Sequence, residues 1–250
     1  MLLLLSGSKC LIPKPLKLSF LDEAVSIGVT FNWTTNVPHC FILNEAIKRF
    51  NWGLRLRHPL MEKLPTHAST LDTLMISIKD DCDERIQAVM PRETMKEDYT
   101  LEISNGTILI SASEVWGAMH ALNTVLQLTF SSTTYKALLK GVRIDDSPRF
   151  AFRSYLIDTS RHFISIQKIR DFIEAMAFVK MNIFHWHIVD DHSFPFESST
   201  YPDLSRKGAY DPSAAVYTFD DVQGVIEFAR LRGIRVMPEF DTPGTQKVIY

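Results

Sequence analysis

The spacing of apolar residues predicts helices and strands in the first part of the chain. In FILNEAIKRF, residues 41–50, apolar side chains recur at the three- and four-residue spacing of an amphipathic helix. Residues 70–81 alternate between apolar and polar or small side chains, and in YTLEISNGTILIS two β-rich runs flank Asn105-Gly106, a pair that favours a hairpin turn. A further helix is predicted after Ser113, its expected cap. This part should therefore combine an antiparallel sheet with helices.

From residue 153 onward the pattern alternates between strand and helix. The runs RSYLID, NIFHWHIVDD and IRVMPEFD are predicted as strands. Between them lie two predicted helices, one capped by Ser165 and one capped by Thr218 and ended by Gly233. An excursion at 192–217, rich in Ser, Pro and Tyr, precedes the second helix. This order predicts parallel βαβ units and an α/β fold.

Each of the three predicted strands ends in carboxylates. The residues are Asp158, then Asp190 and Asp191, then Glu239 and Asp241. The C-terminal ends of parallel strands meet at one edge, where ligands bind in such folds. The sequence therefore predicts a site for a polar substrate at this edge, in a (β/α) barrel.

Composition describes a globular protein of one large or two ordinary domains. The chain has 250 residues, 46% of them hydrophobic, which is enough for a sizeable core. A boundary is predicted near Pro148, with a leader at 1–20, an α+β domain at 21–140 and a second domain at 141–250. The four leucines of the leader are fewer than a secretory signal usually contains. No run approaches the roughly 20 apolar residues of a membrane span.

The charge and the cysteine content limit which binding partners and which cellular compartment are expected. With 27 basic and 29 acidic residues and no basic run, a nucleic-acid partner is not expected. Three cysteines allow at most one disulfide and lack the close pairing of a zinc site, and no cofactor is predicted. Asn32 and Asn105 begin glycosylation sequons, which matter only if the chain enters the secretory pathway.

Several polar residues near the strand ends have two interpretations each. His185 and His187 share a strand face, which would suit a metal-dependent barrel hydrolase or a hydrogen-bonded pair; a metal would need further ligands from later strands. Arg161 could hold sugar hydroxyls or form a surface salt bridge. Adjacent strand residues alternate sides, so only one of Asp190 and Asp191 is expected to be functional.

The carboxylates at the end of the last predicted strand also have two interpretations. Glu239 and Asp241 share a face, as the paired carboxylates of glycoside hydrolysis would, or they could form one hydrogen-bonded network.

Long stretches of the chain resemble the β-N-acetylhexosaminidases of glycoside hydrolase family 20. They include PRFAFRSYLIDTSRHF, KMNIFHWHIVDDHSFPFES, YPDLSRKGAY and VIEFARLRGIRVMPEFDTPG, and the resemblance covers about residues 38–244. It implies a small α+β domain followed by a (β/α)8 TIM barrel, of which this chain would hold the first three βα units. The implied substrate is a terminal β-linked N-acetylglucosamine or N-acetylgalactosamine of a glycoconjugate. Catalysis would be retaining and substrate-assisted, with the 2-acetamido oxygen as nucleophile.

The resemblance also assigns residues. Arg161 matches the arginine that grips sugar hydroxyls, Asp190 matches an active-site aspartate, and Asp241 matches a member of the network that supports the general acid. The regions of Cys40 and Cys82 match segments that a disulfide joins in animal members. The resemblance further implies a lysosomal or secreted protein that can form a homodimer at full length.

Two departures from the family pattern shape the expected activity. Thr245 follows DTPG where the family has a histidine, and the catalytic Asp-Glu pair, which lies at the end of a fourth strand, has no counterpart in the chain. We therefore expect a truncated product without its general acid, inactive by itself. The alternatives are a non-catalytic carbohydrate-binding homologue and the metal-dependent hydrolase.

Overall fold

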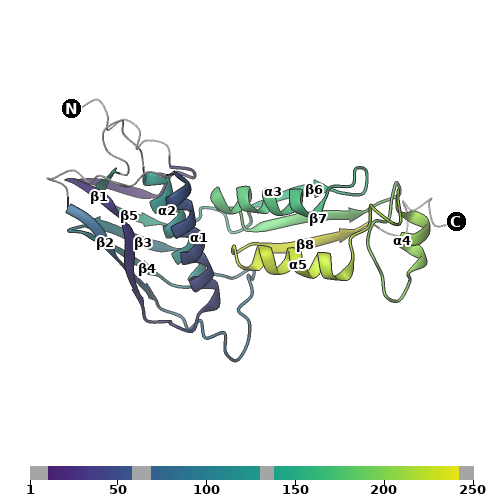
Figure 1. Cartoon of the computed structure of the whole chain (residues 1–250), viewed down its shortest axis with the longest axis horizontal. Helices are drawn as coiled ribbons and strands as arrows, with labels where there is room; N and C mark the ends of the chain where they lie inside the picture. Colours follow the sequence, from purple (N-terminus) through teal and green to yellow (C-terminus); the bar gives the residue numbers. More distant parts are fainter. Residues whose placement is uncertain (1–10, 58–68, 130–137, 242–250) are drawn as a thin grey trace. The chain divides into compact units, whose positions relative to one another are not determined.

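The computed structural model describes residues 11–57, 69–129 and 138–241, which form two compact units (Figure 1). The first comprises Met1–Val89 with Thr94–Arg149, and the second comprises Met90–Glu93 with Phe150–Tyr250. Thr245 and Cys10 lie outside the described residues. Among the residues described, none of the helices has the length and apolar character needed to cross a membrane.

The first unit contains five strands that close on themselves in the order β1-β2-β4-β3-β5. Their bounds are β1 Lys17–Thr35, β2 Ser69–Ile78, β3 Tyr99–Ser104, β4 Thr107–Ala112 and β5 Leu138–Asp146. Closure depends on the length of β1, which pairs with β5 through its first half and with β2 through its second half. The sheet is mixed, since β1-β2 and β2-β4 are parallel, so the prediction of an antiparallel sheet is wrong for these pairs.

The first unit also contains two long helices. They are α1, Phe41–Arg57, and α2, Val115–Leu128, which packs against β3, β4 and α1. Most of α2 is buried, and a Cβ at Gly117 would lie 2.1 Å from the Asp98 carbonyl oxygen, so the close approach requires glycine. The predicted cap is wrong by one residue: Glu114 holds the N-cap position, and the Ser113 hydroxyl donates to Asp98 Oδ2 at 2.6 Å.

The predicted hairpin is confirmed. β3 and β4 pair antiparallel, with Ser104 opposite Thr107. Asn105 and Gly106 form the two-residue turn, with φ of 49° and 76°. Positive φ at both positions is what a tight turn compatible with strand twist requires, and the Asn-Gly pair adopts it at low cost.

Two strands of the first unit had no counterpart in the prediction. β5 carries the alternation of a half-buried strand, with Val142 and Ile144 buried and Arg143 exposed, but its polar residues were interpreted as a domain boundary. β1 overlaps the predicted leader from Lys17 onward. Ile12 also exchanges two hydrogen bonds with the Gln127 side chain, at 2.8 and 2.9 Å, so these residues of the leader prediction belong to the first unit.

A disulfide joins Cys40, just before α1, to Cys82, as predicted, with Cα atoms 5.0 Å apart. Both cysteines are buried. Glu84, two residues further on, accepts a hydrogen bond from the Ile42 backbone N–H at 2.7 Å, at the start of α1. The covalent bond and this charged cap together fix the segment after β2 on the N-terminus of the helix.

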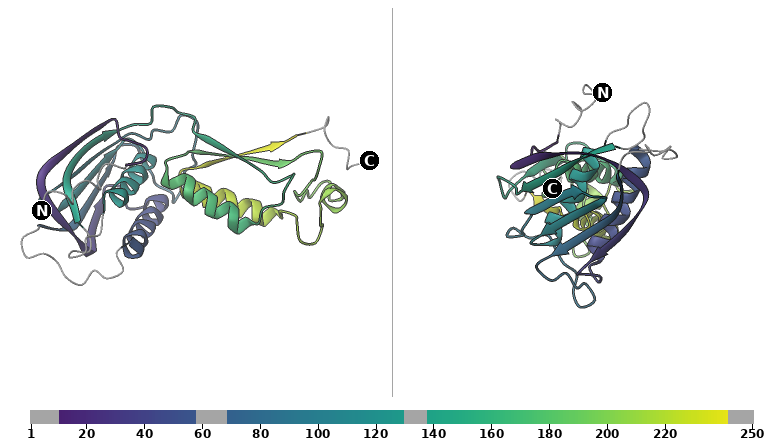
Figure 2. Two further views of the ribbon diagram at one scale, coloured as in Figure 1. Left: turned by 90° about the horizontal axis from the view of Figure 1, so that it is seen from above. Right: turned by 90° about the vertical axis from the view of Figure 1, so that its left-hand side faces the viewer.

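The second unit is a parallel three-stranded sheet with two long helices. Its elements are β6 Ser154–Asp158, α3 Ile166–Phe178, β7 Ile183–Val189, α4 Asp203–Gly208, α5 Phe219–Arg230 and β8 Arg235–Phe240. The strand order is β6-β7-β8, and the predicted strand-helix alternation is confirmed. α3 and α5 lie on the same face of the sheet (Figure 2). The short α4 lies within the excursion at 192–217, where no helix was predicted.

The two faces of β7 differ in chemistry. Phe184, Trp186 and Ile188 are buried in the apolar cluster that includes residues of α3 and α5. Side chains alternate along a strand, so His185 and His187 point to the opposite face. The helices therefore cover an apolar face, and the second face is left for polar side chains.

The disulfide should stabilise the first unit by reducing the number of conformations open to the unfolded chain. The bridge spans a sequence separation of 42 residues, for which chain-entropy arguments give about 2–4 kcal/mol. We expect Cys40→Ala/Cys82→Ala to lower the free energy of unfolding by that amount in urea titrations followed by circular dichroism. Reduction should destabilise the unsubstituted chain equally and leave the double variant unaffected. An unsubstituted chain that is insensitive to reductant would contradict this.

The two predicted N-cap residues of the second unit, Thr218 and Ser165, allow a test variant and a matched control. Thr218 Oγ1 accepts from the Asp221 N–H at 3.1 Å and the Asp221 carboxylate accepts from the Thr218 N–H at 3.0 Å, whereas Ser165, at the N-cap of α3, makes no side-chain cap bond. We expect Thr218→Ala to cost about 1 kcal/mol, measured as roughly five-fold faster amide exchange in α5. Ser165→Ala should leave exchange in α3 nearly unchanged, and equal effects of the two would refute the assignment.

Candidate active site at the strand ends

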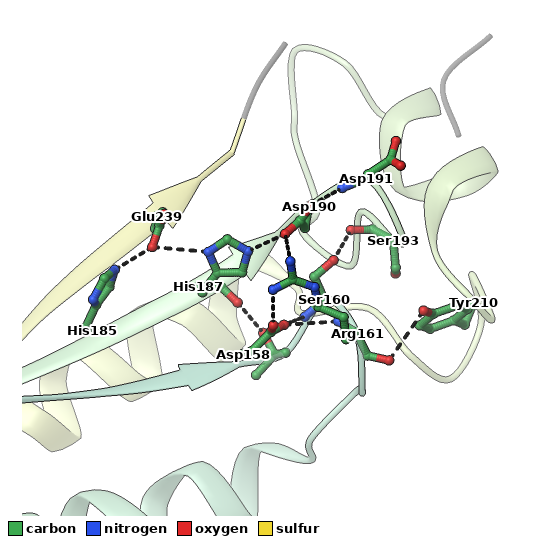
Figure 3. Close-up of polar contacts among 11 residues, drawn as sticks. Asp158, Ser160, Arg161, His185, His187, Asp190, Asp191, Ser193, Tyr210 and Glu239 are labelled. Carbon is green, nitrogen blue, oxygen red and sulfur yellow. Dashed lines mark hydrogen bonds and ion pairs between the residues drawn. The ribbon is translucent and has the colours of Figure 1, made fainter. Parts of the chain in front are cut away.

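The C-terminal ends of the three parallel strands bring polar side chains onto one face. The register places Asp158 of β6 beside His187 of β7, and His187 beside Glu239 of β8. Partners in a parallel ladder point to the same side of the sheet, so the three side chains form one row (Figure 3). We call this row, with Arg161, His185, Asp190 and Asp241, the rim cluster.

Arg161 lies in a turn that Asp158 organises. Asp158 Oδ1 accepts the backbone N–H groups of Ser160 and Arg161, both at 3.0 Å, and its second oxygen pairs with the Arg161 guanidinium. The turn is fixed to β7 because the Thr159 N–H donates to the His187 carbonyl at 3.0 Å and Trp186 Nε1 donates to Thr159 Oγ1 at 2.8 Å. The arginine is thus held at the rim, with 45% of its side chain exposed.

Asp190 is the most buried carboxylate of the rim cluster, at 4% exposure. Its Oδ2 lies 2.6 Å from Arg161 Nη2 and 2.9 Å from His187 Nε2. Reciprocal backbone bonds between Asp190 and Ser193 close a tight turn, and the Ser160 hydroxyl donates to the Ser193 carbonyl at 2.8 Å. Asp191 is half-buried and contributes its backbone N–H to Asp190 Oδ1. Of the adjacent pair, Asp190 is therefore the one whose side chain belongs to the cluster.

A register shift explains how Asp190 reaches the same side as His187. Strict alternation from His187 would send Asp190 to the helix-covered face. The ladder between β7 and β8 shifts between His187 and Val189, so that His187 pairs with Glu239 and Val189 with Phe240. The extra residue on β7 turns the following carboxylate toward the histidine.

The two histidines converge on Glu239. Glu239 Oε2 lies 2.6 Å from His185 Nε2 and 3.1 Å from His187 Nδ1. The other ring nitrogen of His187 faces Asp190, so carboxylates engage both nitrogens. Of the two interpretations of the histidine pair, the contacts are those of the hydrogen-bonded one.

Asp241 joins the cluster from the end of β8. Its backbone N–H donates to the Val189 carbonyl at 3.4 Å, and its carboxylate lies within 4.8 Å of the facing atoms of His187 and Asp190. These three residues could supply one nitrogen and two oxygen ligands to a metal ion. His187 Nε2 and Asp190 Oδ2, however, face each other across 2.9 Å, a hydrogen-bond distance.

The contacts shift the ionisation of the cluster. Burial raises the pKa of the Asp190 carboxyl, but the Asp191 N–H, His187 and Arg161 outweigh it and hold that pKa below its ordinary value. Asp158 is likewise lowered in pKa, since Arg161 outweighs burial, and His187 and His185 lower the pKa of Glu239. Burial lowers the pKa of the His187 ring, but Glu239 and Asp190 raise it overall. At neutral pH these three carboxyls are ionised.

The predicted residues Arg161, Asp190 and Asp241 lie together, but the sequence did not assign the residues that connect them. Asp158 and His187 hold the arginine and the aspartate in place. The sequence feature that could have identified both residues is the alignment of the strand ends, because Asp158 and His187 occupy the same row as Glu239. Tyr210, whose hydroxyl donates to the Arg161 carbonyl at 3.3 Å, ends the family-like stretch YPDLSRKGAY, but the sequence assigned it no role.

Comparison with known proteins identifies relatives of both units. Residues 150–249 match the family model "Glycosyl hydrolase family 20, catalytic domain", and residues 11–128 match "beta-acetyl hexosaminidase like". The chain is 41% identical over 211 residues to beta-hexosaminidase subunit alpha of Bos taurus, covering 82% of this chain and 39% of the relative. It is 43% identical over 216 residues to the human beta-hexosaminidase subunit beta, covering 84% and 38%. It thus spans about two fifths of the relatives' length.

Solved structures agree with this assignment. The chitobiase of Flavobacterium johnsoniae superposes with a TM-score of 0.80 at 28% identity, covering 94% of this chain and 35% of that one. The exo-β-N-acetylglucosaminidase of Vibrio harveyi, solved in complex with N-acetylglucosamine, gives 0.73 at 26% identity, covering 94% and 36%. The two family models between them account for most of both units, and the chain therefore belongs to glycosyl hydrolase family 20.

Proposed function

We propose that this chain forms the sugar-holding part of a β-N-acetylhexosaminidase, an enzyme that removes terminal β-linked N-acetylglucosamine or N-acetylgalactosamine from glycoconjugates. The observation that carries the proposal is the position of Arg161, fixed between Asp158 and Asp190 at the strand ends. A planar guanidinium held in this way can donate to two neighbouring hydroxyls of one sugar ring. The ionised Asp190 beside it can accept a hydrogen bond from a sugar hydroxyl.

The same proposal covers the domain organisation. The first unit would be the N-terminal domain of such an enzyme, and the part of the second unit from Phe150 onward would be the first three βα units of its TIM barrel. The boundary predicted at residues 140 and 141 is moved to Arg149 because β5 pairs with β1 and β3 of the first unit. The parallel order β6-β7-β8, with α3 and α5 on one face, supports this, because a barrel has its helices outside and its ligands at the C-terminal strand ends. The polar second face of the sheet would line the barrel interior.

The rim cluster is better suited to holding a sugar than to donating a proton. A general acid needs a carboxyl whose pKa is raised toward the working pH. Asp158, Asp190 and Glu239 all have lowered pKa values. In substrate-assisted hydrolysis, where the sugar's acetamide oxygen attacks the anomeric carbon, the general acid would have to be a residue other than these three.

This division favours one alternative, a carbohydrate-binding homologue without catalysis. A binding protein would need Arg161 and Asp190 and would not need a protonated carboxyl. The two functions differ in whether sugar binding by the rim cluster accompanies hydrolysis in the complete protein.

We also propose a lysosomal or secreted location, and a homodimer for the full-length protein. The disulfide between Cys40 and Cys82 supports passage through an oxidising compartment. The sequon residues Asn32 and Asn105 are both exposed, as glycosylation would require. The dimer rests on the family resemblance alone.

The sugar-holding role predicts a specific sensitivity at Arg161. Arg161→Lys should weaken the binding of N-acetylglucosamine, followed by NMR chemical-shift titration, by about ten-fold, since a single ammonium cannot replace the two-pronged contact. Arg206→Lys is the matched control, because Arg206 forms an exposed pair with Asp203 within α4. Equal affinities of the two variants would exclude Arg161 from the binding site.

The lowered pKa values of Asp158, Asp190 and Glu239 predict the activity of the 250-residue chain assayed by itself. We expect less than about one per cent of the turnover of an intact family member on an aryl N-acetyl-β-glucosaminide, because none of the three carboxyls is poised to donate a proton. The measurement is release of the aryl alcohol between pH 4 and 7. Turnover at several per cent of the intact enzyme would require a proton donor in this chain and would disprove the assignment of roles.

A further inference from the structure

Glu239 occupies an unusual place in the rim cluster. One oxygen, Oε2, serves both His185 and His187, and the side chain is 40% exposed. Among the contacts described for this part of the chain, Glu239 reaches Arg161 and Asp190 only through the His187 ring (Figure 3). Any influence of Glu239 on a bound sugar would therefore pass through His187.

The His187 ring is surrounded by acidic groups. Glu239 of β8 faces Nδ1, Asp190 faces Nε2, and the carboxylates of Asp158 on β6 and Asp241 after β8 lie nearby. A neutral imidazole has one N–H and can donate to only one of its two carboxylate partners, whereas the imidazolium donates to both. Because each ring nitrogen faces a carboxylate, the ring cannot rotate without losing one of these two contacts.

The Asp190 carboxylate depends on this ring for its orientation. Oδ2 is shared between His187 Nε2 at 2.9 Å and Arg161 Nη2 at 2.6 Å, so the histidine fixes which way the oxygen is presented to the arginine. A His187 ring that turned away would leave a nearly buried carboxylate with Arg161 as its remaining side-chain donor among these contacts.

We propose that Glu239 is a positioning residue, which holds the His187 ring so that Nε2 fixes the Asp190 carboxylate beside Arg161. His185 supports the carboxylate of Glu239 from the other side, at 2.6 Å. The inference rests on the proposed function only in treating Asp190 and Arg161 as sugar ligands. The connection from Glu239 to Asp190 is a property of the free chain.

The ionisation of the cluster agrees with this connection. Burial lowers the pKa of His187, and Glu239 is the largest influence that raises it. A raised pKa means that the imidazolium is complete below the ordinary histidine value of about 6.5 and is lost only as pH rises through the higher folded value. The same charge contributes to the low pKa of Asp190.

The test follows both residues in the full chain by NMR, without any ligand. Histidine ring ¹⁵N shifts, assigned with His187→Gln, give the titration of His187, and carboxyl ¹³C shifts give that of Asp190. In the unsubstituted chain His187 should stay doubly protonated above pH 6.5. In Glu239→Gln its midpoint should fall by about one pH unit, the size expected for one carboxylate partner, and the midpoint of Asp190 should rise.

His185→Gln is the matched control. It also removes one contact of Glu239 but keeps the carboxylate charge, so His187 and Asp190 should titrate as in the unsubstituted chain. Unchanged midpoints in Glu239→Gln, or the same shifts in both variants, would overturn the proposal. If Glu239→Gln does not fold, the unsubstituted chain still decides, because a His187 that titrates at or below about 6.5 would refute a controlling carboxylate at Nδ1.

Sugar binding is measured separately. If the chain binds N-acetylglucosamine, Glu239→Gln should weaken binding several-fold at pH 7, and the loss should shrink below pH 6, where His187 is protonated in both proteins. A loss that is independent of pH would overturn the positioning role. A chain that binds no sugar counts against the proposed function, while the ligand-free titrations still decide the connection between Glu239 and Asp190.

Discussion

The arrangement of the strand ends depends on one nearly buried carboxylate. Asp190 is 4% exposed, and an ion at that depth would cost several kcal/mol if it lacked partners. Its partners come from separate segments: Arg161 follows β6, His187 lies within β7, and the Asp191 N–H belongs to the turn after β7. These segments must keep their relative positions for the charge to stay paired. The carboxylate thus links the chemistry of the rim to the packing beneath it.

That packing gives each face of the sheet a separate task. Phe184 and Trp186 pack toward α3 and α5, and the Trp186 N–H reaches across to Thr159, which supports the turn that carries Arg161. The helix side therefore fixes the rim from below. The opposite side, free of the demands of an apolar core, accommodates the row of Asp158, His187 and Glu239. Neighbouring positions along β7 therefore alternate between the apolar core and the polar row.

The sequence predicted the three strands and the two long helices of the second unit, and the edge where the site lies, because periodicity and caps are local signals. It did not predict which carboxylate would contact Arg161 and which would contact His185 or His187. Alternation allowed only one of Asp190 and Asp191 to face the site but did not choose between them; the choice comes from the register shift after His187, a property of the β7-β8 pairing. The missed β5 shows the converse, since its alternating Val142 and Ile144 were present in the sequence but were outweighed by nearby polar residues.

The same contacts that would let the rim cluster hold a sugar, as we propose, also limit what else it can do. Arg161 lowers the pKa of Asp158 and Asp190, and the histidines lower that of Glu239, so each carboxyl is an acceptor at neutral pH. A proton donor needs the opposite surroundings, with burial or neighbouring negative charge that favours the protonated form. A carboxyl within reach of the Arg161 guanidinium would lose its proton too readily. In a glycosidase built on this scaffold, the groups that hold the sugar and the acid that cleaves it therefore have to occupy electrostatically separate parts of the site.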